Sequence, residues 1–259
     1  MVQRDVTAGG AVLIRSVARA MALLRAFDGD ARELGVSELS RRVGLHKSTV
    51  SRLLATLEHA GMLERTVDGE RYRLGFAVVR LAGRAARAGG LREAAQPVMA
   101  RLAAQTGEAV HLAVPDGSEV VNIEQIAGEY RLQATSWVGR RTPFHCVANG
   151  KAMLAAWPDA ALGERCPAPL RQYTPHTITT RPALRRELAA ARQRGYALAL
   201  GEVEEGLYAV AAAILDAAGQ PLAAVSVSGP AQRMTTAQLE RYGALVAQAA
   251  REISARLAA

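Results

Sequence analysis

A short run of polar side chains between residues 47 and 52 has the chemistry needed to contact DNA. Lysine and arginine bind phosphate groups, and serine and threonine hydroxyls hydrogen-bond to phosphate oxygens or to base edges. The run contains, in order, Lys47, Ser48, Thr49, Ser51 and Arg52. These residues lie opposite an apolar stripe and near the start of a predicted helix, where a recognition helix reaches the bases. We therefore expect this segment to contact DNA.

The run belongs to a predicted pair of short helices between Val36 and Leu63. Gly44 supplies the turn between the two helices, and Ser37 is the expected N-cap of the first helix. Apolar residues recur at the spacing of buried helical faces, namely Val36, Leu39 and Val43 in the first helix and Val50, Leu53, Leu54 and Leu57 in the second. Helical hairpins with a solvated polar face are common, so this pattern alone leaves that alternative open.

A predicted β-hairpin follows the helix pair directly. Asp68-Gly69 is a typical hairpin turn between the expected strands Leu63–Val67 and Arg71–Leu74. A helix capped by Ser16 and ending near Phe27 precedes the pair. Residues 14–75 thus predict a winged helix-turn-helix domain. Three hairpin arginines could contact phosphates or a minor groove, and they are Arg65, Arg71 and Arg73.

The excess positive charge of the chain is concentrated in its first third. The formal net charge is +8. Residues 1–90 carry fifteen Lys and Arg against nine Asp and Glu, a net of +6, whereas the remaining residues carry seventeen against fifteen, a net of +2. Phosphate binding requires such a local excess. A generally basic composition would not explain the asymmetry.

The length of 259 residues is sufficient for two domains of ordinary size. Residues 76–89 predict a linker helix, and Gly89-Gly90 is the best boundary before a second domain at residues 90–259. Strands are expected at Ala109–Val114, Val120–Ile126, Leu132–Val138, Tyr196–Leu200, Leu207–Leu215 and Pro221–Ser228, and helices after residue 90, at Val147–Trp157, at Pro182–Arg194 and at Thr236–Leu257. Antiparallel strands with packed helices make an α+β domain.

Two segments of the second domain have the chemistry of an anion site. The sequence HCVANGKA turns into the helix that begins near Val147. The first N–H groups of a helix have no intrahelical partner, so they suit a carboxylate. Ser226 and Ser228 alternate along a predicted strand and therefore offer two hydroxyls on one face. A polar strand face remains the alternative for this pair of serines.

Other classes of function find little support in the sequence. The spacings of His111, His145, Cys146 and His176 match no metal motif. His145 and Cys146 are adjacent, so their side chains would diverge on a strand. No nucleophile elbow, phosphate loop or dinucleotide fingerprint occurs. We therefore expect no catalytic residues, no metal and no cofactor.

Composition also indicates where in the cell the protein is expected to be. Two cysteines cannot form a disulfide framework or a four-thiolate zinc site. No apolar run approaches the about 18 residues of a membrane span, and the N-terminus lacks the pattern of a signal peptide. The sequence predicts a cytoplasmic protein that acts at the nucleoid through DNA, with no membrane partner.

With these motifs described, nearly the whole chain resembles the IclR family of bacterial transcriptional regulators. The first domain matches in GLHKSTVSRLLATLEHAGMLER and RYRLG, and the second in GEAVHLAV, DGSEVV, VGRRTPFHCVANGKAML, RGYAL and EGLYAVAAAILDAAGQPLAAVSVSGP. The resemblance implies a winged helix-turn-helix, a linker helix and a ligand-binding domain with a curved sheet related to the GAF fold. It also implies a homodimer or a tetramer built as a dimer of dimers. Ala148, Asn149, Ser226 and Ser228 match positions that line the effector pocket of the family.

The chain departs from the family pattern at several of these positions. Ala209 stands where the family usually has a pocket Cys, and Tyr208 stands where Arg is common. Ala199 and Leu200 replace frequent acidic residues, whereas Glu202 is retained. Possible apolar walls, which would suit a larger or aromatic acid, are Trp137, Phe144 and Tyr208. In the recognition helix, His46 replaces a frequent Pro and Ser51 a frequent His, so base preference cannot be transferred from relatives.

The function expected from these features is that of a ligand-responsive transcriptional regulator. It would bind a palindromic double-stranded operator as a homodimer, with contacts from His46, Lys47, Ser48, Thr49, Ser51, Arg52, Arg65, Arg71 and Arg73. A small organic acid would bind at Ala148, Asn149, Tyr208, Ala209, Ser226 and Ser228. Repression is the expected outcome. The alternatives are an activator of the same architecture and an enzyme fused to a DNA-binding domain.

Overall fold

A computed structural model describes residues 7–8, 11–12, 14–28, 31–87, 90–129 and 136–258. The chain divides into two compact units, residues 1–88 and 89–259, which are described separately below. The expected strand Leu132–Val138 and the expected boundary at Gly89 lie wholly or partly outside the described residues. Of that strand, Ser136, Trp137 and Val138 are described; they do not form a strand, and Val138 lies in a turn.

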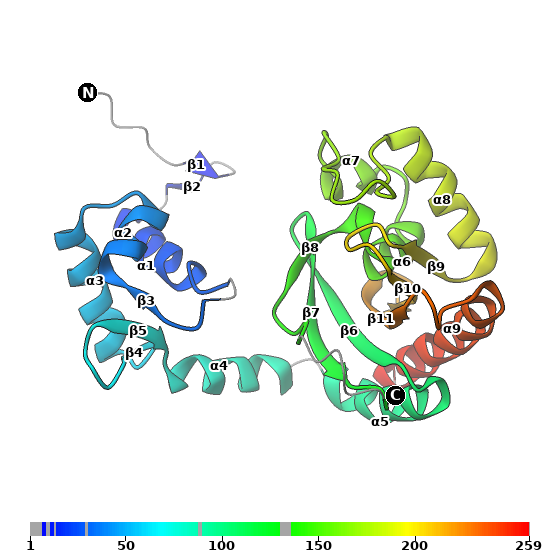
Figure 1. Cartoon of the computed structure of the whole chain (residues 1–259), viewed down its shortest axis with the longest axis horizontal. Helices are drawn as coiled ribbons and strands as arrows, with labels where there is room; N and C mark the ends of the chain where they lie inside the picture. Colours follow the sequence, from blue (N-terminus) through cyan, green and yellow to red (C-terminus); the bar gives the residue numbers. More distant parts are fainter. Residues whose placement is uncertain are drawn as a thin grey trace. The chain divides into compact units, whose positions relative to one another are not determined.

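The first unit is a three-helix domain with a small sheet (Figure 1). Its helices are α1 (Arg15–Arg25), α2 (Val36–Val43), α3 (Lys47–His59) and, after the sheet, α4 (Phe76–Arg87). The three-stranded sheet has the order β3 (Leu34–Gly35), β5 (Arg71–Leu74), β4 (Leu63–Arg65), and two short strands, β1 (Thr7–Ala8) and β2 (Ala11–Val12), pair with each other. The first three helices and the sheet enclose a core of Leu23, Phe27, Leu34, Leu39, Val50, Leu54, Leu57, Leu63 and Tyr72. The predicted winged helix-turn-helix is thus confirmed.

The turn between α2 and α3 depends on Gly44. Its φ of 67° lies in the left-handed region, which residues with a Cβ adopt at a cost. The Oγ of Ser40 donates to the carbonyl oxygen of Leu45 at 2.5 Å, and this contact holds the chain as it leaves α2. The turn therefore sets the angle at which α3 follows α2.

The expected caps at Ser16 and Ser37 were wrong. Helix α1 already begins at Arg15, and neither helix has a side-chain cap. Strand β3 pairs with β5 through Leu34 and Gly35 and leads directly into α2. Ser37 consequently lies inside the first turn of α2 instead of ahead of it.

The second unit contains one antiparallel sheet of six strands. Their spatial order is β8 (Arg141–Pro143), β7 (Glu119–Ile126), β6 (Ala109–Asp116), β11 (Pro221–Pro230), β10 (Leu207–Leu215) and β9 (Ala197–Leu200). Successive residues of a strand point to opposite faces, so each strand contributes side chains to two separate cores. This arrangement confirms the predicted α+β class.

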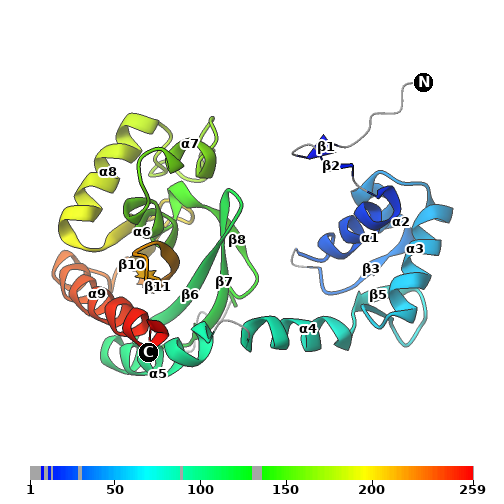
Figure 2. The ribbon, with the colours of Figure 1, turned by 180° about the vertical axis from the view of Figure 1, so that it is seen from behind.

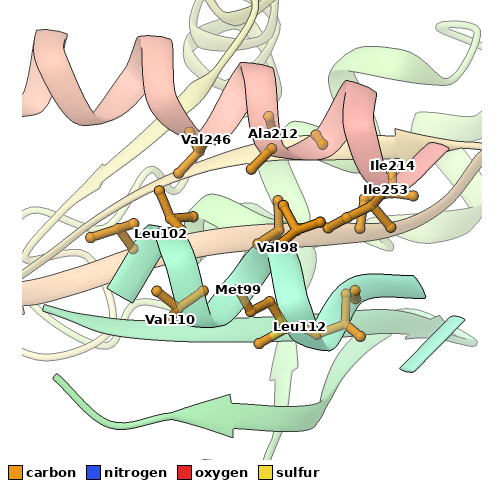
Figure 3. Packing of buried hydrophobic residues seen from close by; sticks show 14 of the residues in the cluster. Val98, Met99, Leu102, Val110, Leu112, Ala212, Ile214, Val246 and Ile253 are labelled. Atoms are coloured by element: carbon orange, nitrogen blue, oxygen red, sulfur yellow. The ribbon is translucent and has the colours of Figure 1, made fainter. Parts of the chain in front are cut away.

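Long helices cover one face of this sheet. They are α5 (Leu91–Thr106) and α9 (Thr236–Ala258), which Figures 1 and 2 show lying next to each other in both views. Figure 3 shows Val98, Met99 and Leu102 of α5 packed among side chains of β6, β10 and α9. This core consists of apolar side chains and forms the structural side of the unit.

The other face carries the shorter helices. They are the 3-10 turn η2 (Phe144–Cys146), α6 (Ala148–Ala156), α7 (Ala161–Arg165) and α8 (Arg181–Arg194), which lie across the sheet from α5 and α9 (Figure 2). A second core joins α6 and α8 to the sheet through Ala152, Met153, Leu184 and Ala211. Alternation along β11 sends Val225 and Val227 into the first core, whereas Ala224 and Ser226 face the second.

Candidate DNA-contacting surface and ligand cavity

The N-terminal half of α3 presents an exposed polar face. Val50, Leu54 and Leu57 are buried in the core of the first unit. On the other side Lys47, Ser48, Ser51 and Arg52 are exposed and Thr49 is partly buried. Within the described part of the chain, no carboxylate pairs with Lys47 or Arg52. Both cations are therefore available to a phosphate backbone.

His46 caps α3. Its Nδ1 accepts a hydrogen bond from the backbone N–H of Ser48 at 3.3 Å and lies 2.8 Å from the Ser48 Oγ. Imidazole thus takes the role that a Ser or Asp side chain usually has at an N-cap. Because Nδ1 is used in this way, the ring is oriented and its Nε2 is the nitrogen left for an outside partner.

The three arginines of the wing differ from Lys47 and Arg52, because each already has a partner. Arg65 Nε lies 3.1 Å from a Glu58 oxygen, and its guanidinium lies 5.0 Å from the centre of the Tyr72 ring. Arg73 pairs with Glu64 at 3.2 Å. Arg71 donates to the carbonyl oxygen of Glu33 at 3.3 Å. Contact of Arg65 or Arg73 with a phosphate would have to compete with a carboxylate.

The second unit contains a cavity with about 520 Å³ of empty space, partly open to solvent, between the sheet and the start of α6. This figure includes space that is open to solvent, and the space that can hold the centres of water-sized molecules is about 50 Å³. Its lining comprises His111, Val120, Asn122, Trp137, Thr142, Val147, Ala148, Asn149, Ala199, Val203, Leu207, Ala209, Ser226 and Ser228. Five of the six residues predicted for the effector site are among them. Among the residues that the structure describes, the lining has no Lys, Arg, Asp or Glu side chain.

Tyr208 is the predicted residue that does not line the cavity. Its neighbour Ala209 does, and adjacent strand residues face opposite sides of a sheet. Tyr208 accordingly packs against the core formed by α5 and α9. The Arg-to-Tyr departure therefore alters the other face of the sheet and leaves the cavity wall unchanged.

Strand register brings the polar floor of the cavity together from distant parts of the sequence. His111 of β6 pairs with Ser226 of β11, and its Nε2 lies 3.0 Å from the Oγ of Ser228. Asn122 comes from the neighbouring strand β7. On the opposite flank, Ala209 of β10 pairs with Ala199 of β9, so that part of the floor is apolar.

The start of α6 forms the roof near the polar part of the floor. Asn149 donates through Nδ2 to Oδ1 of Asn122 at 3.4 Å. Gly150 allows η2 to lie against the helix, since a Cβ there would be 2.3 Å from the carbonyl oxygen of Phe144. The N–H of Lys151 donates to the carbonyl oxygen of Val147 at 3.0 Å, and this is the first hydrogen bond within the helix. The preceding N–H groups have no partner within the helix and suit an anion.

Several polar atoms around this cavity are buried without a hydrogen-bond partner. Within the described residues, they include Nδ1 of His111, Oγ1 of Thr142 and Oδ1 of Asn149. Burial lowers the pKa of His111 from 6.5 to about 4, so the ring is neutral at pH 7. A neutral imidazole bonded to a hydroxyl can offer either a donor or an acceptor at its second nitrogen.

Of the three aromatic residues predicted as walls of the cavity, only one lines it. Trp137 lines the cavity, and the guanidinium of Arg140 lies 3.9 Å from the centre of the indole. Phe144 is fully buried and packs edge-on against Trp157, with ring centres 5.7 Å apart. Phe144 thus belongs to the second core and does not reach the cavity.

His111, Asn122 and Thr142 were not predicted as site residues. Each lies on a strand, and their convergence depends on the register of β8, β7, β6 and β11. A weak signal was present for His111, because a polar residue occurs in the otherwise apolar strand AVHLAV. Val203 and Leu207 come from the loop and strand after β9 and carried no chemical signal.

His145 and Cys146 lie on the 3-10 turn η2 and not on a strand, contrary to expectation. Nε2 of His145 lies 2.9 Å from the carbonyl oxygen of Arg171, and burial raises the pKa of Cys146 to about 12. Such a thiol stays protonated and is a poor nucleophile. In the described ranges, no cluster of three His, Cys, Asp or Glu side chains could hold a metal ion. No helix in the same ranges is long and apolar enough to cross a membrane.

Comparison with known proteins finds two family models that together cover most of the chain. The model described as "IclR helix-turn-helix domain" matches residues 16–66, and the model "Bacterial transcriptional regulator IclR C-terminal" matches residues 84–255. The HTH-type transcriptional regulator Rv1719 of Mycobacterium tuberculosis is 38% identical over 95% of this chain and 92% of its own. The HTH-type transcriptional repressor AllR of Escherichia coli is 31% identical over 94% of this chain and 90% of its own.

A solved structure gives the same result at the level of the fold. It is an IclR homologue from Microbacterium hydrocarbonoxydans in complex with 4-hydroxybenzoate, 32% identical to this chain, with a TM-score of 0.82. The similarity covers 93% of this chain and 98% of the homologue. The relatives are named as regulators of transcription. The chain belongs to the IclR family of bacterial transcriptional regulators, and it is a DNA-binding regulator and not an enzyme.

Proposed function

We propose that this regulator binds a pseudo-palindromic operator as a homodimer and changes its affinity for that operator when a small organic acid enters the cavity of the second unit. The observation that carries the proposal is the cavity at the start of α6, in the same chain as a recognition helix with two unpaired cations. An anion site and a phosphate-binding helix in one chain fit a ligand-controlled switch.

The DNA contacts are assigned by exposure and charge. Lys47 and Arg52 of α3 bind phosphates, while Ser48, Thr49 and Ser51 lie on the face that meets base edges in the major groove. His46 orients the start of the helix and offers Nε2. Of the wing arginines, Arg71 contacts the phosphate backbone, and Arg65 and Arg73 do so in competition with Glu58 and Glu64.

A second copy of the chain is proposed to cover apolar residues of the first unit. On α1 and the residue before it, Ile14, Val17 and Met21 are 70%, 54% and 44% exposed. On α4, Phe76 and Val79 are 69% and 62% exposed. Apolar stripes on two helices of one small unit mark an interface. A twofold interface places paired recognition helices about 34–36 Å apart, one turn of DNA. Two such dimers would make a tetramer.

The effector is proposed to be a small organic acid, and an aromatic one fits the site. The free N–H groups at the start of α6 bind its carboxylate, assisted by Ser226 and Ser228. Trp137 offers one aromatic surface. The complex of the related homologue with 4-hydroxybenzoate supports this class of ligand.

Repression is the proposed outcome in the absence of effector. The related AllR is named as a repressor, which supports this direction for a regulator of the same architecture. An activator of the same architecture is the alternative. Either outcome requires that the acid bind one arrangement of the dimer more tightly than the other. In vitro transcription from the operator-bearing promoter, with and without the acid, distinguishes the two.

One experiment tests ligand and DNA binding together. Operators are first selected from random duplex DNA with the full chain, and binding is then measured by gel shift with and without each of a panel of aromatic and aliphatic organic acids. We expect a palindromic consensus and an affinity that changes with the acid. The Ser226→Ala/Ser228→Ala variant should retain DNA binding and lose the response. A normal response in that variant would place the effector elsewhere, and unchanged DNA binding by Arg52→Ala would contradict the role of α3.

A further inference from the structure

The polar and apolar groups of the cavity are separated along the sheet. Crossing the floor from β8 and β7 through β6 to β11, the side chains other than Val120 are polar: Thr142, Asn122, His111, Ser226 and Ser228. The floor then continues with Ala209 of β10 and Ala199 of β9. Val203 of the loop after β9 and Leu207, the first residue of β10, add two further apolar residues to this flank. One end of the cavity offers hydrogen bonds and the other offers none.

The start of α6 belongs to the polar end. Asn149, in its first turn, is hydrogen-bonded to Asn122 of β7 at 3.4 Å. A carboxylate bound by the first N–H groups of α6 therefore lies over the polar part of the floor. The apolar flank under β10 and β9 is left for the body of the ligand.

Buried polar atoms without a hydrogen-bond partner indicate which groups the ligand carries besides its carboxylate. Seven buried side-chain nitrogen or oxygen atoms lack a hydrogen-bond partner in the described part of the chain, and three of them belong to residues that line this cavity. They belong to His111, Thr142 and Asn149, whose exposures are 6%, 3% and 7%. Leaving such groups unpaired costs free energy, so a ligand that pairs with them gains affinity.

A carboxylate alone cannot satisfy this set. An ionised carboxylate only accepts hydrogen bonds, and Oδ1 of Asn149 also only accepts. A hydroxyl group can donate to Asn149 and accept from Thr142 or from the imidazole of His111. Since the described residues of the lining include no charged side chain, a second carboxylate would find no cation among them.

We infer that the effector is a monocarboxylic acid with a hydroxyl group close to its carboxylate and an apolar body without polar substituents, that is, an apolar 2-hydroxy acid. This inference rests on the proposed effector site and narrows its ligand class. The pairing of Ala199 with Ala209 makes the flank under β10 and β9 apolar, so a hydroxyl placed there finds no hydrogen-bond partner in either of these side chains.

Four acids that differ in one feature test the inference by calorimetric titration of the full chain. Mandelate carries the hydroxyl beside the carboxylate, phenylacetate lacks it, 4-hydroxyphenylacetate carries it at the far end, and phenylsuccinate adds a second carboxylate. We expect mandelate to bind at least about tenfold more tightly than each of the others, with one enantiomer preferred. Equal or tighter binding of phenylacetate or 4-hydroxyphenylacetate would overturn the inference while leaving the effector site in place. No binding of any acid would count against both.

Two variants test at which end of the cavity the hydroxyl group of the ligand is bound. Thr142→Val keeps the shape of the side chain and removes its hydroxyl, so the preference for mandelate over phenylacetate should shrink at least threefold. Ala209→Ser adds a hydroxyl at the apolar end and should improve binding of 4-hydroxyphenylacetate relative to mandelate. An unchanged preference in both variants would contradict the assigned orientation.

Discussion

Nζ of Lys151 lies 2.5 Å from Oε1 of Glu202, and both side chains are buried, with exposures of 1% and 8%. The pair joins α6, whose first turn borders the cavity, to the loop after β9, which carries Val203. The backbone of Glu202 is held as well, because its carbonyl oxygen accepts a hydrogen bond from Thr177 at 2.5 Å. The ion pair therefore holds α6 and the loop after β9, two walls of the cavity, at a fixed distance from each other.

Replacement of Lys151 by methionine should destabilise the second unit by about 3–5 kcal/mol, because Glu202 would stay buried without a cation. The double variant Lys151→Met/Glu202→Leu should recover much of this loss. Urea unfolding followed by tryptophan fluorescence measures it, since both tryptophans, Trp137 and Trp157, lie in this unit.

The control for that measurement is Arg256→Met. Arg256 pairs with Glu252 at 3.0 Å on the exposed side of α9, where ion pairs contribute less than about 1 kcal/mol. Equal effects of the two single variants would mean that burial adds nothing to the Lys151–Glu202 pair.

Acid should destabilise the second unit partly through His111. Burial lowers the pKa of His111 from 6.5 to about 4, so between these pH values the unfolded chain binds a proton there and the folded chain does not. The free energy of unfolding therefore falls as the pH is lowered from about 6.5 to about 4, by on the order of 3 kcal/mol from this group. Urea unfolding at pH 7 and pH 4.5 should show a smaller loss for His111→Asn than for the natural chain. Equal losses of stability in the variant and the natural chain would contradict the role assigned to His111.

Removal of a wing carboxylate should strengthen DNA binding. Glu64 pairs with Arg73 at 3.2 Å, and its second oxygen accepts from the N–H of Phe76. Glutamine at position 64 keeps an acceptor for Phe76 and releases Arg73 to a phosphate. We expect the affinity for a mixed-sequence duplex to rise about three- to tenfold and the salt dependence to steepen by about one ion.

Fluorescence anisotropy at several salt concentrations measures this effect. Glu252→Gln makes the same change of charge in the second unit and serves as the control. An increase of the same size in the control would trace the effect to net charge instead of Arg73.

Disruption of the apolar stripe on α1 should dissociate the dimer. Val17 is 54% exposed, and aspartate at this position would place a charge in the interface proposed for a second copy. Sedimentation velocity should show monomers for Val17→Asp and dimers or tetramers for the natural chain. Leu222→Asp alters an exposed leucine of the second unit and should not change the assembly. A dimeric Val17→Asp variant would place the interface elsewhere.

Periodicity and turn chemistry were sufficient to predict most helices and strands of this chain. The buried stripe from Val50 to Leu57 predicted α3, and Asp68-Gly69 predicted the wing. The caps failed because a cap depends on where the preceding strand ends, and β3 is only two residues long. Tyr208 could have been rejected from sequence, because it is adjacent to Ala209 on one strand.

The polar end of the cavity could not be predicted in the same way. His111, Asn122 and Thr142 meet only because β6 pairs with β7 and with β11, and because β7 pairs with β8. Such non-local register leaves no trace in local patterns. The segment HCVANGKA could be identified because its chemistry comes from consecutive residues at a helix start.

The two cores of the second unit have a consequence for how a signal leaves the cavity. The cavity and α6 lie on one face of the sheet, whereas α5, the helix through which the chain enters this unit, lies on the other. Strand β10 exposes Ala209 to the ligand and sends Tyr208 and Val210 toward α5 and α9. A ligand that shifts this strand by a fraction of an ångström moves both layers at once. Strand β10 thus contributes to both layers, and its alternating residues connect the cavity wall to the core under α5 and α9.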